Sequence, residues 1–283
     1  MKVPNEVVTA GRNSIFETGS KMMINGQYLD AIQLFDEAIG IIPYHARAWY
    51  AKGECLLYLK QYEKSIICFD NALRFDPGYQ EAGFRENPGF PKELENLKRL
   101  VVHLNESVKI EPNNAELLYN RGVMMRVLGK INEALDSFEQ VIKIKPDSFD
   151  AWSYKGGLLG IAGWHERDPL LPRVVVPQQL NDAIKAYDQA LKIKRDQVAL
   201  LNSGVVMVRA GQRNHALKSF DEAIRMSPEY GDAWVQKGVL LVKMKKREEA
   251  DKCFERALQI NPEYFMYYGT YIEEYRPSPL TWD

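Results

Sequence analysis

The chain has 283 residues and carries 37 basic and 38 acidic side chains, a formal net charge of −1. This balance argues against a nucleic-acid-binding protein, because binding to phosphates depends on an excess of lysine and arginine. No run approaches the roughly 20 apolar residues of a membrane span, and residues 1–8 lack the apolar stretch of a signal peptide. We therefore expect a cytoplasmic protein with no nucleic-acid partner and no membrane partner.

The cysteines and histidines do not form a recognisable site. Cys55, Cys68 and Cys253 are odd in number and widely spaced, which favours free buried thiols in a reducing compartment over a disulfide or a zinc site. The four histidines do not pair with a cysteine or a carboxylate at the spacing of metal ligands. His45 and His215 lie at predicted helix starts, where we expect exposed side chains. We predict no metal and no cofactor.

One pattern of residues recurs along the chain. Gly19 is followed 12, 16 and 24 positions later by Ala31, Phe35 and Pro43. The same frame begins again at Gly53, Gly122, Gly156, Gly204 and Gly238. A period near 34 residues is typical of a helical solenoid, in which each repeat contacts its neighbours. The pattern predicts an architecture, but it does not identify what binds to it.

Each repeat is predicted to contain two helices. Residues 115–128 carry apolar residues at i, i+3, i+4 and i+7, the spacing of one helical face. After a short break, a second such run over residues 131–144 ends at a proline, which lacks the amide donor that a continuing helix needs. Side chains such as those of Asn113 and Asn114 are placed to cap the next first helix.

The glycines and aromatic residues of the pattern are predicted to pack in the core. A glycine inside a helix costs about 1 kcal/mol relative to alanine, so its recurrence indicates a close approach of two helices. We expect Gly122 to face Ala134, and the aromatic Phe138 to fill the space toward the next repeat. Three tryptophans, each four residues before a glycine, should join the same core: Trp49, Trp152 and Trp234.

Seven repeats are expected in a single domain over residues 1–283. The third is degenerate, because Pro88 stands at its glycine position and residues 86–91 should end its first helix early. A longer second helix should then begin near Lys92. The predicted repeats are 12–45, 46–79, 81–114, 115–148, 149–196, 197–230 and 231–264, followed by a capping helix and tail at 265–283.

An insertion at residues 164–178 interrupts the fifth repeat, where 27 positions separate Gly156 from Ala183 in place of the usual 12. Its three prolines argue against a helix, and its run of valines favours a strand. Loops of this length are often functional. The insertion is expected to pack on its own solenoid, to cover a groove, or to contact a partner through apolar residues: Leu170, Leu171, Val174, Val175 and Val176.

These repeats resemble the tetratricopeptide repeat family. The match is Trp-x-x-x-Gly in the first helix, followed by Ala-x-x-x-aromatic-x-x-Ala-x-x-x-x-Pro in and after the second, over roughly residues 12–264. The resemblance implies an all-α fold, a right-handed α-solenoid superhelix of antiparallel helix pairs. It also implies that the first helices line a concave groove, whose commonest role in the family is to hold peptide segments of other proteins.

The resemblance further implies which side chains line that groove, and their mix of apolar area and hydrogen-bonding groups suits an extended or helical peptide. The family's clamp for chaperone termini is not expected, because Asp150 and Asp232 stand where that clamp needs cations. Tyr119 and Tyr154 have an alternative role in covering the adjacent repeats. The candidate groove residues are Tyr50, Glu54, Tyr58, Tyr119, Asn120, Val123, Tyr154, Asn202, Val205 and Gln236.

The sequence holds no strong candidate for catalysis, with neither a Gly-rich phosphate loop nor a Gly-x-Ser-x-Gly turn. Residues 165–168 offer acid–base groups, but four adjacent residues cannot all converge on one substrate. We predict a non-catalytic scaffold or adaptor that binds a peptide segment of a partner protein. The alternatives are a structural homo-oligomer joined through its end repeats or the insertion, and a regulatory subunit or small enzyme that uses the insertion.

Overall fold

The computed structural model describes residues 5–77, 90–162, 164–165, 174–175 and 177–261. The chain divides into two compact units, residues 1–193 and residues 194–283. The division falls inside the fifth predicted repeat, so the repeat pattern runs through both units. The single domain over the whole chain stays a prediction.

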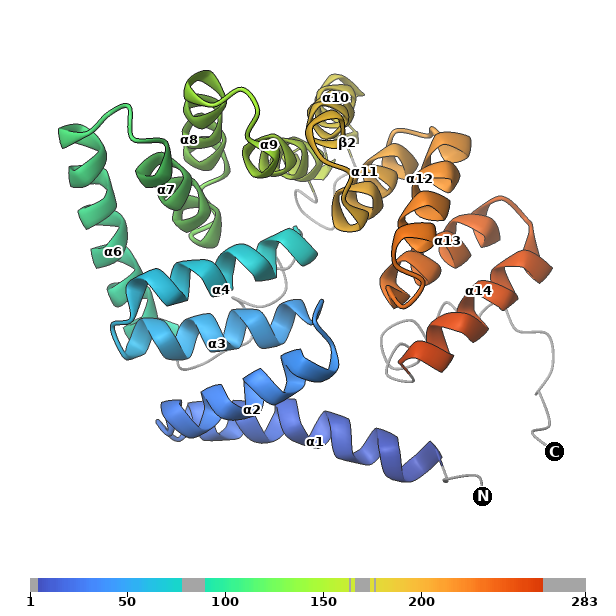
Figure 1. Cartoon of the computed structure of the whole chain (residues 1–283), viewed down its shortest axis with the longest axis horizontal. Helices are drawn as coiled ribbons and strands as arrows, with labels where there is room; N and C mark the ends of the chain where they lie inside the picture. Colours follow the sequence, from blue (N-terminus) through green and yellow to red (C-terminus); the bar gives the residue numbers. More distant parts are fainter. Residues whose placement is uncertain (1–4, 78–89, 163, 166–173, 176, 262–283) are drawn as a thin grey trace. The chain divides into compact units, whose positions relative to one another are not determined.

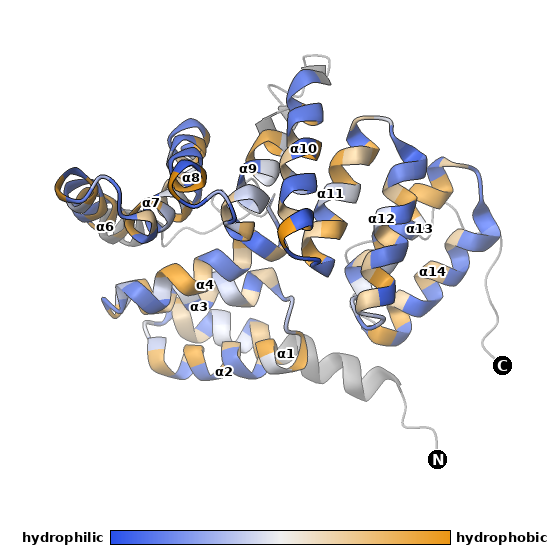
Figure 2. Ribbon diagram, turned by 45° about the horizontal axis from the view of Figure 1, so that its top comes forward, coloured by the Kyte–Doolittle hydropathy of each residue, from blue (hydrophilic) through white to orange (hydrophobic). Residues whose placement is uncertain are grey.

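The described residues form thirteen helices, and consecutive helices pack in pairs (Figure 1). The predicted all-α solenoid of helix pairs is confirmed. Unit 1 contains α1 (Asn5–Ile24), α2 (Tyr28–Ile41), α3 (Ala46–Tyr58), α4 (Tyr62–Phe75), α6 (Phe90–Ile110), α7 (Ala115–Val127), α8 (Ile131–Ile144), α9 (Phe149–Ala162) and α10 (Pro177–Ile193). Unit 2 contains α11 (Gln197–Arg209), α12 (Arg213–Met226), α13 (Gly231–Lys243) and α14 (Arg247–Ile260). Hydrophilic and hydrophobic residues alternate along α8, α10 and α14, as expected for helices with one buried face (Figure 2).

The turn inside five of the helix pairs has the same backbone geometry. At Gly211, for example, the N–H of the next residue, Gln212, donates to the carbonyl of Met207 at 2.8 Å and closes a Schellman motif. The motif places its central residue in the left-handed region, with φ of 79° at Gly26, 59° at Lys60, 72° at Gly129, 77° at Gly211 and 60° at Lys245. Glycine adopts this region without cost, whereas lysine does not.

Each glycine of the repeated pattern lies against the aromatic ring of its own repeat. A Cβ built on Gly122 would lie 2.8 Å from Cζ of Phe138, closer than real Cβ atoms approach a carbon. The aromatic ring therefore fills the space left by the missing side chain within its own helix pair, and not only the space toward the next repeat. The other pairs are Gly19–Phe35, Gly53–Phe69, Gly156–Tyr187, Gly204–Phe220 and Gly238–Phe254.

Three tryptophans join successive helix pairs. Each indole N–H donates at 2.9 Å to the carbonyl of the proline six residues earlier, in the pairs Trp49–Pro43, Trp152–Pro146 and Trp234–Pro228. A lysine three residues after each tryptophan lies over the indole ring and also forms an ion pair with the preceding helix, in the pairs Lys52–Asp36, Lys155–Glu139 and Lys237–Asp221. The junction is thus built from one hydrogen bond, one cation–π contact and one ion pair.

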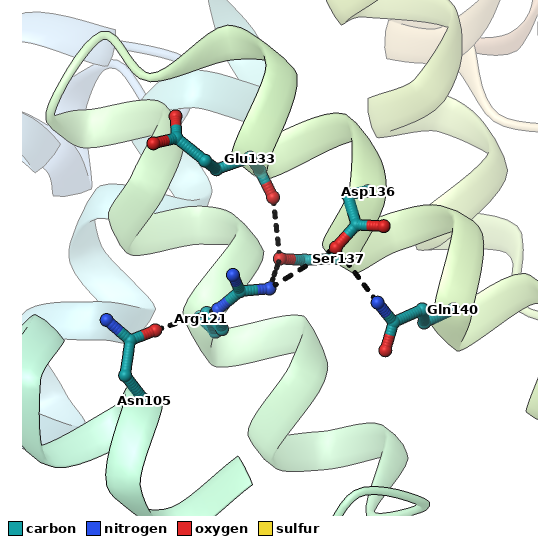
Figure 3. A network of polar contacts seen from close by, with 6 residues as sticks. All are labelled: Asn105, Arg121, Glu133, Asp136, Ser137 and Gln140. Carbon is teal, nitrogen blue, oxygen red and sulfur yellow. Dashed lines mark hydrogen bonds and ion pairs between the residues drawn. The ribbon is translucent and has the colours of Figure 1, made fainter. Parts of the chain in front are cut away.

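Arg121 occupies the equivalent lysine position on α7 (Figure 3). Its Nε donates to Oδ1 of Asn105 on α6 at 2.9 Å, and its Nη1 donates to Oγ of Ser137 on α8 at 2.8 Å. A weaker ion pair links Nη1 to Asp136 at 3.6 Å. One guanidinium therefore connects three helices at the junction that follows the degenerate repeat.

Polar side chains cap the first helices. The Asn114 side chain accepts from the N–H groups of Glu116 at 3.1 Å and Leu117 at 3.2 Å, which confirms the predicted cap. Asp196, which is buried, caps α11 through two bonds of 3.0 Å in the same way. His45 caps α3 through Nδ1, which accepts from the N–H of Ala48 at 3.2 Å.

The insertion is a short hairpin in the part that the structure describes. β1 (Trp164–His165) pairs antiparallel with β2 (Val174–Val175), which confirms the predicted strand. Leu170, Leu171 and Val176 lie outside the described residues, as does the predicted capping helix at 265–283. α10 begins at Pro177, so the insertion ends two residues before its predicted limit. Proline suits this first helical position, where its missing N–H has no partner in any case.

The degenerate third repeat changes the path of the chain in unit 1. Its long helix α6 begins at Phe90, close to the start predicted near Lys92. α6 packs on α7 as the second helix of any repeat packs on its successor, but α4 also packs directly on α7. Figure 1 shows α4 on the inner side of the curve that α6 to α9 describe. One core cluster joins these elements, with Phe69 of α4, Leu100 of α6 and Leu118 of α7 all buried.

Candidate partner-binding surface

The candidate groove residues differ in how far they are exposed. Tyr50 and Glu54 of α3 are only 6% and 9% exposed, and Val123 of α7 is fully buried. These three side chains pack in the interior of unit 1 and have little area to offer a partner. The others are half-buried: Tyr58 on α3, Tyr119 and Asn120 on α7, Tyr154 on α9, Asn202 and Val205 on α11, and Gln236 on α13.

Tyr119 and Tyr154 are held by a carboxylate from α4. The hydroxyl groups of both tyrosines donate to Oδ1 of Asp70, each at 2.7 Å. The Tyr154 hydroxyl also lies 3.1 Å from the backbone oxygen of Asp70. The two tyrosine rings meet edge to face, with their centroids 5.9 Å apart. Repeats 2, 4 and 5 thus converge on one acidic side chain.

The last turn of α4 and the residues that follow it make three further contacts with the same face. The guanidinium of Arg126, on α7, donates from Nη2 to the carbonyl of Pro77. Pro77 also lies over Gly157 of α9, where a Cβ would stand 3.5 Å from the proline Cβ. Arg74 of α4 lies over the ring of Phe149, 5.7 Å from its centroid. Residues 70–77 therefore cover positions that the family resemblance assigns to the groove of repeats 4 and 5.

Burial governs the ionisation of this cluster. Removal from water raises the pKa of Asp70 above its ordinary value of 3.8, and the nearby Asp150 carboxylate adds to the increase. Hydrogen bonds from Tyr119 and Tyr154, and the Arg74 charge, act in the opposite direction. Burial together with the Asp70 charge raises the pKa of both tyrosines well above 10.0. Both hydroxyl groups therefore keep their protons and remain donors.

The role of Asp70 was missed by sequence reasoning. Asp70 follows the aromatic residue Phe69 on the second helix of its repeat. At the same position of the first repeat, Asp36 forms an ion pair with Lys52 of the next repeat. The repeat after α4 is the degenerate one, and this is the only signal in the sequence that Asp70 is free for another role. Its partners lie 49 and 84 positions later in the chain.

Aromatic side chains gather at the first two repeats. The rings of Tyr28 and Tyr58 lie 3.9 Å apart, and the ring of Phe16 stacks on His45 at 5.2 Å. Burial, with a smaller contribution from the Arg47 charge, lowers the pKa of His45 from 6.5 to about 4. His45 is therefore a neutral, half-buried capping residue, and the expectation of an exposed side chain is wrong for it. His215 is exposed, as expected.

Unit 2 presents the same family positions on two first helices in direct contact, α11 and α13. Val205 and Gln236 are half-buried there, beside Val206 and Val235, which are buried. A half-buried mixture of valine and glutamine offers both apolar area and hydrogen-bonding groups.

The chemistry of the described side chains is that of a packed repeat. Cys55, Cys68 and Cys253 are buried free thiols, and burial raises the pKa of Cys68 and Cys253 to about 11, so neither is an activated nucleophile. Among these residues no group of three or more acidic, histidine or cysteine side chains is placed to hold a metal ion. Within the same ranges, no helix has both the length and the apolar composition to cross a membrane.

Helix pairs with a fixed Gly–aromatic contact, a Schellman turn and a tryptophan junction define an α-solenoid of short helical repeats. Models of the tetratricopeptide repeat match residues 46–79, 115–148 and 231–264. These three ranges coincide with the second, fourth and seventh repeats predicted from the sequence. The chain therefore contains tetratricopeptide repeats in these three ranges.

Curated relatives share this repeat at low identity. Human tetratricopeptide repeat protein 13 is 23% identical over 178 residues, which cover 61% of this chain and 19% of that protein. Human mitochondrial import receptor subunit TOM70 is 22% identical over 231 residues, 76% of this chain and 34% of its own. The wheat Hsp70-Hsp90 organizing protein is 22% identical over 198 residues, 68% and 32% of the two chains. This chain thus spans between 19% and 34% of the length of these relatives.

Solved structures resemble the fold. The crystal structure of MamA superposes with a TM-score of 0.52 at 20% identity, over 64% of this chain and 98% of that one. A shorter form, MamA 41-end from Desulfovibrio magneticus RS-1, also has a TM-score of 0.52 at 20% identity, over 59% and 87% of the two chains. At this identity the likeness shows the fold alone.

Proposed function

We propose that the protein is a non-catalytic scaffold or adaptor that binds a segment of a partner protein. The tetratricopeptide architecture supports this proposal, because its stacked helix pairs build an extended surface. Two relatives are named an import receptor subunit and a Hsp70-Hsp90 organizing protein, names that describe a receptor and an organiser of other proteins. The cytoplasmic location stays a prediction.

The observation that carries the proposal is the half-buried face of α11 and α13. Val205 and Gln236 lie at groove positions of adjacent first helices, and each keeps part of its side chain accessible. In unit 1 two of the candidate groove residues, Tyr119 and Tyr154, are instead bonded to Asp70 of the same chain. We therefore place the partner site on α11 and α13, with Asn202 as its third member.

A pull-down from the source lysate tests this placement. The bait is the full chain, either unaltered or with Val205→Arg, and the control bait carries Met226→Arg on the second helix α12, where Met226 is 38% exposed. Both substitutions put an arginine in place of an apolar side chain, so they match in chemistry. We expect one prey to be captured by the unaltered and Met226→Arg baits and lost from Val205→Arg. Equal capture by all three would place recognition elsewhere.

Light scattering on the same preparations checks the homo-oligomer predicted as the alternative. A scaffold that uses α11 and α13 for a partner gives a mass near the 32.5 kDa of one chain over a wide concentration range. A multiple of that mass, reduced by changes at Val174 and Val175 in the hairpin, would instead favour assembly through the insertion.

A further inference from the structure

We propose that the turns inside the two helix pairs of unit 2 form a single basic edge, which binds an acidic segment of a partner protein. The basic edge comprises six residues in these two turns and at the adjoining helix ends: Arg209, Arg213, Lys243, Lys245, Lys246 and Arg247. This inference rests on the proposed function, because it names the charge of the segment that the scaffold holds.

The positive charge of this edge is local. Residues 209–213 and 243–249 together carry six basic and two acidic side chains, although the whole chain has a formal net charge of −1. One of the two acids, Glu249, forms an ion pair with Lys246 at 3.0 Å. Four exposed cations of the edge form no ion pair with a carboxylate in the described part of the chain: Arg213, Lys243, Lys245 and Arg247.

The opposite edge of unit 2, where α12 and α14 end, is built differently. Arg195 and Arg225 there lie 3.4 Å and 3.9 Å from the carboxylate of Glu222. Arg256 lies 2.9 Å from the carboxylate of Glu229. Cations that are free to meet an external carboxylate are therefore concentrated at the basic edge.

The two turns of the basic edge lie next to each other. α11 and α13 are in direct contact and, because each is followed by an antiparallel second helix, they run in the same direction. Both turns therefore lie on one side of unit 2, away from the α12–α13 connection (Figures 1 and 2). Packed helices lie about 8–10 Å apart, so about three extended residues of a partner span both turns. Arg209 follows Val205 by one helical turn, so the edge continues the proposed partner site.

Lys245 keeps a positive charge at a backbone position that favours glycine. Its φ is 60°, and the equivalent turns of other repeats carry Gly129 and Gly211. A positive φ costs free energy in a residue with a Cβ, and such strain is often retained at functional positions. Lys60 has a similar φ of 59°, but it is the only basic residue in its turn, residues 58–62. The clustering of cations, together with the strain, therefore marks the edge.

The surroundings of the basic edge favour an acidic protein segment over a membrane. Proteins that lie on a membrane surface insert apolar side chains between the lipids. The only exposed large apolar side chain in the described part of unit 2 is Met226, at the far end of α12. A nucleic acid is disfavoured by the net charge of the chain.

The probe is a fluorescent synthetic peptide of alternating aspartate and serine, added to the full chain. A peptide with asparagine in place of aspartate is its control. We expect only the acidic peptide to bind, and its affinity to fall as the ionic strength is raised from about 0.05 M to about 0.5 M, because salt screens exposed charges. Absence of binding at the lower ionic strength would overturn the inference.

Two triple variants that remove the same charge locate the binding. The edge variant carries Arg213→Gln, Lys243→Gln and Arg247→Gln, and the control variant carries Arg195→Gln, Arg225→Gln and Arg256→Gln. We expect the edge variant to bind the acidic peptide about tenfold more weakly, and the control variant to lose less than about twofold. Equal losses would show that binding follows net charge alone and would overturn the inference.

Lys245→Gly separates lost binding from lost folding. It relieves the positive φ, so the chain should become more stable while the acidic peptide binds about two- to fivefold more weakly. Lys60→Gly relieves the equivalent strain in unit 1 and should leave binding unchanged. Unchanged binding by Lys245→Gly, or an equal loss in both variants, would contradict a role for the edge.

Val205→Arg keeps this test independent of the pull-down. It adds a cation beside the edge and should not weaken binding of the acidic peptide, even where it removes the prey. Loss of the prey without edge-dependent peptide binding would therefore overturn this inference alone. Tighter edge-dependent binding of a single-stranded RNA, or of vesicles rich in phosphatidylserine, would overturn the choice of a protein segment.

Discussion

The ring of Phe138 stacks on the ring of Tyr154 in the next repeat, with centroids 4.5 Å apart and ring planes inclined by only 7°. The same phenylalanine lies against Gly122 of its own repeat and is fully buried. The ring is therefore fixed by contacts in two repeats, and it has little freedom to move away from an atom added at Gly122.

Gly122→Ala should destabilise unit 1. Its Cβ would lie 2.8 Å from the Phe138 ring, and the cost of such overpacking is about 1–3 kcal/mol in the free energy of unfolding. Urea denaturation followed by the helical signal measures it. Gly40→Ala is the control, because Gly40 lies in α2 with no atom within 4 Å of the added Cβ, and alanine should stabilise that helix by up to about 1 kcal/mol. Equal effects at the two sites would contradict the Gly–aromatic packing.

Lys245→Gly should stabilise the α13–α14 turn. Lys245 has a φ of 60°, a conformation that costs a residue with a Cβ about 1–2 kcal/mol, whereas the equivalent Gly211 adopts it freely. After the greater flexibility of glycine in the unfolded chain is subtracted, we expect a gain of about 1 kcal/mol in thermal or urea unfolding. Lys246→Gly, one residue later at a φ of −101°, should give no gain.

Asn114→Ala should remove the cap of α7. The Asn114 side chain satisfies two N–H groups at the helix start, and loss of such a cap typically costs about 1 kcal/mol. The neighbouring Asn113 is exposed and caps nothing, so Asn113→Ala should change stability by less than about 0.5 kcal/mol. Comparison of the two urea midpoints isolates the cap from any general effect of asparagine at this turn.

His45 should make stability depend on pH in the acidic range. Its pKa is about 4 in the folded protein and 6.5 without the surrounding structure, so below 6.5 the unfolded chain binds the proton more readily. The free energy of unfolding therefore falls as the pH is lowered from 6.5 toward 4, at up to about 1.4 kcal/mol per pH unit.

His45→Asn provides the matched comparison. Asparagine retains a side-chain acceptor for the N–H of Ala48 but does not titrate, so the cap remains and the proton linkage is lost. Subtracting the pH profile of this variant from that of the unaltered chain removes the contribution of the carboxylates. A difference that stays flat between pH 4 and pH 6.5 would show that His45 titrates normally in the folded state.

The local part of the fold could be predicted from the sequence because it depends on contacts within one period. Gly122 and Phe138 are 16 residues apart, and Gly238 and Phe254, which have the same spacing, make the same contact between a glycine and an aromatic ring. The ends of the helices could be predicted for the same reason, because they depend on nearby prolines and capping residues. Asn114, at the start of α7, is an example. The thiols were also predicted correctly, because three widely spaced cysteines leave burial as the simplest role.

The contact between α4 and α9 could not be predicted in this way. It depends on the direction that the chain takes through the degenerate repeat. Residues 86–91 indicate that a helix ends there, but they do not indicate the direction of the helix that follows. The family frame treats every repeat alike and therefore assigns Tyr154 to the groove. The alternative, that Tyr154 covers the adjacent repeat, agrees with its stacking on Phe138, but neither prediction includes its contact with Asp70. Val123 was assigned to the groove by the same frame, and it is fully buried.

The bond between Tyr154 and Asp70 has a consequence for how unit 1 comes apart. In a stack whose repeats touch only their neighbours, terminal repeats can fray singly while the rest persists. Here the second repeat is also attached to the fifth, across 84 positions of the chain, so its detachment would uncover the core beneath α7 as well. The second repeat should accordingly unfold together with the fourth and fifth, and not on its own.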